Sequence, residues 1–217
     1  MPTSRSYEDA CGIARALDVI GERWALLVVR ELLLGPQRFV DLRRSLPRAS
    51  SNMVADRLRE LEGHGVVSRR TLPPPAGSAV YELTEWGREL EPIVLALGSW
   101  GLHVPPPESG TLSATSVLLF LRASARPDPT MPATAYRLEL GDRVWTVHVT
   151  AGKVLVQADA FTKADAALRA TPATFNALLD DPAGLDPALA DGTVAATGDL
   201  PALRRLLQAV ANPAAAS

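Results

Sequence analysis

Residues 50–65 read SSNMVADRLRELEGHG, and this stretch decides the fold of the first half of the chain. Val54, Leu58 and Leu61 recur at intervals of four and three residues, which places them on one face of a helix. Ser50 or Ser51 is suited to cap the first turn, and Gly65 is suited to end the helix. The stretch therefore predicts an amphipathic helix with a buried apolar stripe and a polar N-terminal end.

The segments on either side predict three helices before this helix and a hairpin after it. This order of elements is that of a winged helix-turn-helix. Proline-rich residues 73–77 separate two short strand-like runs and are typical of a hairpin tip. Thr84 is expected to cap a last helix that continues through Trp100. The expected helices cover residues 11–19, 23–33 and 38–45, and the expected strands cover 66–72 and 80–83.

The polar end of the central helix is suited to reading DNA. Hydroxyl and amide side chains reach base edges, unpaired backbone N–H groups attract a phosphate, and neighbouring arginines contact phosphates. Ordinary solvated charges on a helical domain are the alternative for any one arginine. The predicted DNA-binding residues are Arg38, Arg43, Arg44, Ser50, Ser51, Asn52, Ala55, Asp56, Arg59, Arg69 and Arg70.

The charge distribution agrees with a DNA-facing surface, although the whole chain has a net charge of -2. Residues 23–70 contain ten arginines and five acidic residues, so this segment alone carries a charge of +5. A local basic surface on an acidic protein is what duplex DNA requires. The use of arginine in place of lysine before residue 150 also fits a GC-rich genome.

The second half of the chain predicts a small α+β domain, which gives an α+β protein overall. Prolines and a glycine in residues 104–110 indicate a stiff linker, so the domains are expected at 1–104 and 111–212. Alternating residues with short turns predict an antiparallel meander of three strands. The expected strands are 136–140, 144–149, 153–157, 166–170 and 193–197, and the expected helices are 113–125, 171–179 and 199–210.

Several classes of protein are excluded by composition. No apolar run approaches the roughly 18 residues of a membrane span, and residues 1–9 have no hydrophobic signal region. The single cysteine, Cys11, rules out an internal disulfide and favours the cytoplasm. The three histidines are scattered, and His148 alternates out of phase with the apolar positions of its strand. No catalytic, metal-binding or cofactor-binding motif is present, so we expect no enzyme, no metal and no cofactor.

The first hundred residues closely resemble the HxlR-type regulators. The resemblance implies a two-fold dimer, paired through the first and last helices of the domain, that binds a near-palindromic operator. The helix ending at Trp100 has an apolar face for such a partner, but packing within its own domain explains it equally well. Repression is expected because a dimer on a promoter blocks polymerase. The matching blocks are residues 11–24 (CGIARALDVIGERW), 30–39 (RELLLGPQRF), 42–47 (LRRSLP), 57–62 (RLRELE) and 81–87 (YELTEWG).

Cys11 has two interpretations. In some relatives of this type a cysteine at this point senses electrophiles or oxidants and is followed by proline, whereas Gly12 follows here. A thiol in the first turn of a helix, near Arg15, has a lowered pKa, although Glu8 and Asp9 oppose this effect. Cysteine is also among the small apolar residues that are most often buried, and this second interpretation is the favoured one.

The second half resembles the sterol carrier protein fold, which encloses an apolar tunnel. The hypothesis is that a small apolar ligand binds there and shifts the spacing of the dimer's recognition helices. The alternatives are a domain that only adds dimer surface, a core without a pocket, and a lipid carrier that does not bind DNA. The resemblance rests on residues 145–149, 165–179 and 192–201, and the residues suited to line the pocket are Phe161, Phe175, Leu178, Leu179, Leu203 and Leu207.

Overall fold

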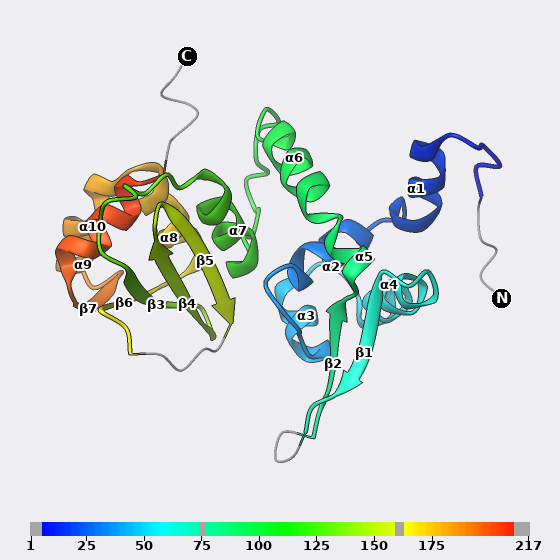
Figure 1. Ribbon diagram of the computed structural model, residues 1–217, viewed down its shortest axis with the longest axis horizontal. Helices are drawn as coiled ribbons and strands as arrows, with labels where there is room; N and C mark the ends of the chain where they lie inside the picture. Colours follow the sequence, from blue (N-terminus) through cyan, green and yellow to red (C-terminus); the bar gives the residue numbers. More distant parts are fainter. Residues whose placement is uncertain (1–5, 74–76, 159–162, 211–217) are drawn as a thin grey trace. The chain divides into compact units, whose positions relative to one another are not determined.

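The computed structural model describes residues 6–73, 77–158 and 163–210 (Figure 1). The chain divides into two compact units, Met1–Pro105 and Pro106–Ser217. No helix in the described ranges is long and apolar enough to cross a lipid bilayer. Within the same ranges, no three His, Cys, Asp or Glu residues are grouped so as to hold a metal ion.

Residues 6–73 and 77–105 of the N-terminal unit form four helices, an antiparallel hairpin and two further helices (Figure 1). This order confirms the predicted winged helix-turn-helix. Residue Gln37 pairs with Tyr81 through both backbone hydrogen bonds, 2.9 and 2.8 Å, and so adds a one-residue third strand to the hairpin. The elements are α1 (Gly12–Ile20), α2 (Ala25–Leu32), α3 (Phe39–Ser45), α4 (Ser51–Gly63), β1 (Val67–Thr71), β2 (Ala79–Leu83), α5 (Glu85–Arg88) and α6 (Glu91–Gly101).

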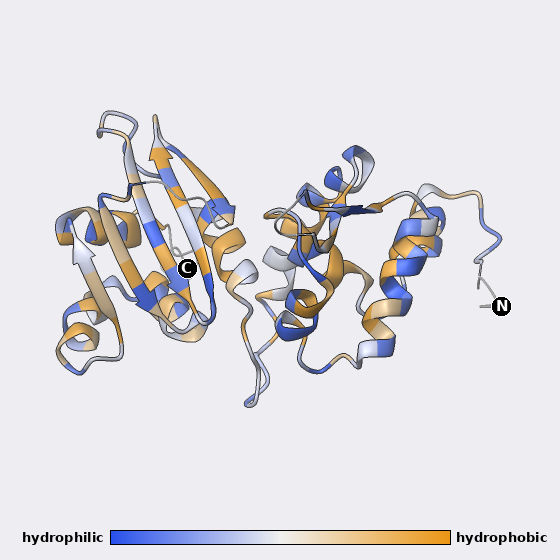
Figure 2. Ribbon diagram, turned by 90° about the horizontal axis from the view of Figure 1, so that it is seen from below, coloured by the Kyte–Doolittle hydropathy of each residue, from blue (hydrophilic) through white to orange (hydrophobic). Residues whose placement is uncertain are grey.

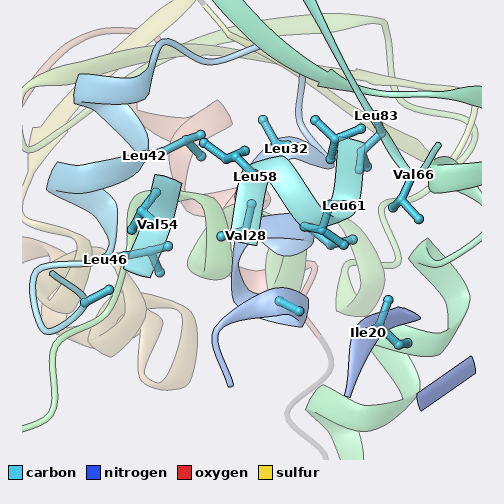
Figure 3. Packing of buried hydrophobic residues seen from close by; sticks show 14 residues of the cluster. Ile20, Val28, Leu32, Leu42, Leu46, Val54, Leu58, Leu61, Val66 and Leu83 are labelled. Carbon is cyan, nitrogen blue, oxygen red and sulfur yellow. The ribbon is translucent and has the colours of Figure 1, made fainter. Parts of the chain in front are cut away.

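The apolar stripe of α4 lies at the centre of the core of this unit (Figure 3). Val54, Leu58 and Leu61 are at most 1% exposed, as the spacing predicted. They pack in one cluster with Val28 and Leu32 of α2. Burying each such side chain stabilises the fold by about 1.5–3 kcal/mol, so the orientation of α4 is strongly determined.

The predicted single helix from Thr84 through Trp100 is wrong, because the structure forms two helices there. Thr84 caps α5 by accepting a hydrogen bond from the amide of Gly87 at 3.0 Å. After α5 the amide of Leu90 donates a hydrogen bond to the carbonyl oxygen of Gly87, three residues earlier, so the turn is tighter than an α-helical turn. Pro92 has no N–H with which to continue the ladder and lies at the start of α6, so the helix restarts there.

The C-terminal unit is a five-stranded sheet in the order β5-β4-β3-β6-β7 with helices (Figure 1). The predicted meander of β3, β4 and β5 is confirmed, while β6 pairs with β3 in parallel and β7 with β6 in antiparallel fashion. The elements are α7 (Ala114–Ser124), β3 (Thr134–Leu140), β4 (Arg143–Thr150), β5 (Lys153–Ala158), β6 (Ala166–Ala170), α8 (Pro172–Asp180), η1 (Pro182–Gly184), α9 (Leu185–Ala190), β7 (Ala195–Gly198) and α10 (Leu200–Gln208).

Three details of this unit differ from the prediction. The short helices η1 and α9 were not expected, because a few residues with two prolines carry no readable period. The strand predicted at 193–197 is β7, which begins two residues later because Asp191 and Gly192 form a turn first. Helix α10 ends at Gln208, two residues before the predicted end, because Val210 bridges back to Ala125.

The sheet of the C-terminal unit has one apolar face and one polar face. Leu138, Trp145 and Val147 are fully buried on the apolar face, against which the helices pack. His148 is half-buried on the opposite face, as its position in the alternation predicted. Figure 2 shows the alternation of apolar and polar residues along the strands.

Candidate nucleic-acid interface

The N-terminal end of α4 presents a polar edge to solvent. Ser50 caps the helix by accepting a hydrogen bond from the amide of Met53 at 3.2 Å. Ser51 and Asn52 are exposed, whereas Ala55 and Asp56 are half-buried one turn later. The first turn contains no acidic residue, so the positive end of the helix dipole is not neutralised there. This end is therefore suited to a phosphate and to base edges.

The guanidinium of Arg43 is held inside the helix-turn-helix. It donates hydrogen bonds to the carbonyl oxygens of Leu46 and Ala49 and, at 3.1 Å, to Oγ of Ser51. These three acceptors lie in the turn between α3 and α4 and at the start of α4. Arg43 therefore holds the turn in shape, which differs from the phosphate contact expected from the sequence.

The hairpin carries two exposed arginines. The guanidinium of Arg69 lies 5.8 Å from the centroid of the Tyr81 ring, and Arg70 is paired with Glu82 at 2.9 Å across the strands. An exposed pair of this kind is worth about 0–1 kcal/mol, so a phosphate can replace the carboxylate at little cost. Both side chains thus remain able to contact DNA.

The remaining predicted arginines are exposed around α3 and α4. Arg38 is the N-cap residue of α3, and Arg44 lies near its end. Arg59 is exposed and forms an ion pair with Asp56 of the same helix, which partly neutralises its charge. Sequence reasoning left out Arg48, which is exposed in the turn before α4. Arg48 is one of the ten arginines of residues 23–70, and this position in the basic segment could have identified it.

Cys11 is the exposed N-cap residue of α1. The backbone N–H groups of Ala14 and, to a smaller extent, Ile13 lower the pKa of its thiol below the usual value. The preceding Asp9 accepts a hydrogen bond from the amide of Cys11 at 2.8 Å. The thiol is thus accessible, and its lowered pKa increases the fraction of thiolate. The alternative interpretation, a buried structural cysteine, does not apply.

Two helices of this unit expose apolar faces. Ile13 and Leu17, one turn apart on α1, are 73% and 41% exposed. Helix α6 has no buried residue, and Trp100 is 69% exposed. A two- to three-turn helix is marginal in water without a packing surface, and these apolar side chains remain exposed in the single chain.

The predicted pocket residues of the C-terminal unit lie in its core. Phe161 lies outside the described residues. The other five, which come from α8 and α10, are at most 3% exposed: Phe175, Leu178, Leu179, Leu203 and Leu207.

The sequences of both units are similar to those of known proteins. Residues 19–108 match the family model described as HxlR-like helix-turn-helix. The HTH-type transcriptional regulator YybR of Bacillus subtilis is 38% identical over 94 residues, which cover 43% of this chain and 75% of YybR. The chain belongs to the HxlR-like helix-turn-helix family. Residues 119–211 match the SCP-2 sterol transfer family, so both predicted resemblances are confirmed.

Other transcriptional regulators are also similar to part of this chain. The HTH-type transcriptional regulator YodB of Bacillus subtilis is 35% identical over 85 residues, which cover 39% of this chain and 76% of YodB. A structure of the redox regulator HypR in its oxidized form is 37% identical, covers 45% of this chain and all of that chain, and has a TM-score of 0.42. The relatives are transcriptional regulators and not enzymes.

Proposed function

We propose that this protein is a cytoplasmic transcriptional repressor that binds a near-palindromic operator as a homodimer. The single observation that carries the proposal is that α4 buries its apolar stripe in the core and exposes its polar N-terminal end to solvent. In a winged helix-turn-helix this is the helix that enters the major groove. Membership of a family of DNA-binding regulators supports the same assignment.

Eight of the eleven predicted residues have a physical role in this proposal. Ser51 and Asn52 read base edges, and the N-terminal amides of α4 hold a phosphate. Arg69 and Arg70 of the hairpin contact phosphates beside the groove, which fixes register without reading sequence. Arg38 and Arg44 do the same from α3, while Ser50 and Arg43 hold the reading helix in place.

The dimer is formed by the apolar faces of α1 and α6. Both faces are exposed in the single chain, and Leu17 also borders a groove between α1 and the C-terminal half of α4. Pairing these helices across a two-fold axis removes the apolar surface from water and fixes the spacing of two copies of α4. Half-sites one helical turn apart require such a fixed spacing of about 34–36 Å.

Fluorescence anisotropy with duplex DNA from upstream of the protein's own gene tests the proposal. Asn52→Ala is expected to weaken binding by about 1–3 kcal/mol and to relax preference at one base pair. Arg205→Ala in the C-terminal unit is the matched control and leaves affinity unchanged. Binding that is indifferent to salt, or to Asn52→Ala, would contradict the assignment of α4 as the reading helix.

A small apolar ligand of the C-terminal unit is our proposal for the regulating signal. The match of residues 119–211 to the SCP-2 sterol transfer family favours it over a unit that only adds dimer surface. A coupling of about 1–3 kcal/mol changes operator affinity about 5–150-fold. Operator affinity measured with and without a lipid panel decides between the two. A lipid carrier without DNA binding would show ligand affinity and no operator affinity.

We also propose that oxidants or electrophiles regulate operator binding by modifying Cys11. Its exposure, its place at the N-cap of α1 and its lowered pKa support this role. Because α1 carries half of the proposed dimer face, a modified Cys11 would disturb the spacing of the two reading helices.

A further inference from the structure

Gln37 is a polar side chain buried in the N-terminal unit. It lies between α2 and α3 and is 2% exposed. Its Nε2 atom donates a hydrogen bond to the carbonyl oxygen of Glu31. That carbonyl lies in the last turn of α2, and the amide four residues further along, that of Gly35, is bonded to Leu32 instead. The side chain of Gln37 therefore caps the C-terminal end of α2.

The backbone of Gln37 holds the hairpin. Its amide and its carbonyl form both hydrogen bonds with Tyr81 of β2, at 2.9 and 2.8 Å. On the neighbouring strand β1, Arg69, Arg70 and Thr71 are exposed, so their pairing with β2 is what fixes their positions. Gln37 thus links the end of α2 to the strand on which the exposed half of β1 depends.

Tyr81 in turn contacts an arginine that faces solvent. Its ring packs in part against the core cluster of the unit. Arg69 is the register partner of Tyr81, so the two side chains project from the same face of the hairpin. The Cζ atom of Arg69 lies 5.8 Å from the centroid of the ring, which is within the range of a cation–π contact. Contact with a fixed ring reduces the number of rotamers open to the long arginine side chain.

The position of the hairpin relative to α4 decides whether both can contact one duplex. A guanidinium contacts a phosphate only within hydrogen-bond distance, about 2.7–3.2 Å, so small changes in the hairpin break the contact. The buried stripe of α4 packs in the same cluster as α2. A link from the end of α2 to the hairpin therefore also fixes the hairpin relative to α4.

We infer that Gln37 and Tyr81 are positioning residues of the DNA interface. Gln37 fixes β2 to the end of α2, and Tyr81 holds Arg69 where it meets a phosphate beside the reading helix. Neither residue contacts DNA itself. The inference rests on the proposed function, in that the hairpin contacts duplex DNA, and it adds the residues that hold the hairpin in the position for this contact.

A double-mutant cycle on the full-length protein tests the inference, with operator affinity measured by fluorescence anisotropy at several salt concentrations. Gln37→Met keeps the length of the side chain and the backbone pairing, and it loses Nε2. The slope of log affinity against log salt concentration is expected to fall by about 0.9 in Gln37→Met, as in Arg69→Ala, because one phosphate contact is lost. The double variant should have the same slope as either single variant, because both changes remove the same contact.

The melting temperature of Gln37→Met separates positioning from general stability. It is expected to change by less than about 4 °C, because two effects oppose each other. The hydrogen bond to Glu31 is lost, but so is Oε1 of Gln37, a buried acceptor with no partner among residues 6–73, 77–158 and 163–210. A residue that acted only on stability would lower the melting temperature and leave the salt slope unchanged.

Tyr81→Leu tests the other end of the link. It keeps the backbone pairing with Gln37, removes the ring, and should also lower the slope by about 0.9. The matched control is Gln157→Met, the same substitution at an exposed glutamine of β5, and it retains the wild-type slope.

Each outcome of the cycle decides the inference. An unchanged slope in Gln37→Met overturns it, and so do losses of slope that add in the double variant. If Gln37→Met does not fold, an unchanged slope in Tyr81→Leu overturns the link to Arg69 and a reduced slope supports it. Wild-type affinity that does not depend on salt would instead overturn the proposed function.

Discussion

At the scale of the residue, Gly87 lies where the first turn of α5 meets Val66, the residue just before β1. A Cβ atom at this position would lie 2.1 Å from the carbonyl oxygen of Val66, which is part of the backbone and cannot rotate away. Gly87→Ala is therefore expected to destabilise the N-terminal unit by about 1–3 kcal/mol in urea denaturation. Gly63→Ala, with no atom within 4 Å of the new Cβ, is the control. Equal stability of the two variants would contradict this packing.

The turn between β4 and β5 stores a small strain at Ala151. Its φ is +47°, followed by Gly152 at +75°, and non-glycine residues rarely adopt this region. Asparagine tolerates it, so Ala151→Asn is expected to stabilise the C-terminal unit by about 0.5–1 kcal/mol. Gly152→Ala should act in the opposite direction, because its Cβ would also lie 3.3 Å from Pro129. Thermal unfolding followed by circular dichroism measures both changes, and a destabilising Ala151→Asn would refute the expectation.

The lowered pKa of Cys11 predicts a shifted pH profile for alkylation. Thiolate is the reacting form, so the fraction available at a given pH is larger than for an unperturbed thiol. Alkylation by iodoacetamide should therefore reach half its maximal rate at a lower pH than alkylation of a cysteine in an unstructured peptide. Because this is the single cysteine of the chain, Cys11→Ser should show no labelling and no loss of operator affinity after treatment. A treated Cys11→Ser protein that still loses operator affinity would exclude the sensing role.

At the scale of the element, Arg43 beside the α3–α4 turn and Arg69 on β1 have different roles in the proposed function. Arg43→Ala loses three hydrogen bonds and is expected to lower the free energy of unfolding by about 1–3 kcal/mol. Its operator affinity should also fall, but the dependence of that affinity on salt concentration (the salt slope) should be unchanged. Arg69→Ala should leave stability unchanged and reduce the salt slope by about 0.9, because one phosphate contact is lost. Binding measured at several salt concentrations distinguishes the two. Similar slopes for both variants would place Arg43 on the DNA.

The elements also show where sequence reasoning reached its limit. Helix α4 was predicted with its cap and its buried face, because both depend on residues within four positions of one another. The break between α5 and α6 was missed, although Pro92 was the signal, since the apolar period continues across it. Two of the three Arg43 acceptors are backbone carbonyls of a turn, and these were not predictable because they have no sequence signature.

At the scale of the whole molecule, the apolar faces of α1 and α6 predict a dimer that depends on Trp100. Trp100→Glu places a charge in the proposed interface, so we expect a monomer in size-exclusion chromatography with light scattering. Operator affinity should fall with it, because one half-site is then bound at a time. Trp86→Glu, on an exposed tryptophan of α5, is the control and should remain dimeric. A dimeric Trp100→Glu protein would contradict the interface.

The sequence alone determined most of the longer helices, the hairpins and the kind of fold in each unit. These features arise from local backbone preferences and from the period of apolar residues, which a linear chain displays directly. The composition also showed the basic segment that the fold places around α3, α4 and the hairpin. The position of the candidate reading helix therefore follows from the order of the residues alone.

The tertiary structure decided which residues meet across long separations in the chain. It inserted β6 beside β3 in parallel, left Ile13 and Leu17 exposed, and placed Arg143 against Trp145. Such outcomes depend on which loops close and which surfaces compete for burial, and these free energies are summed over the whole fold. A local pattern cannot contain them.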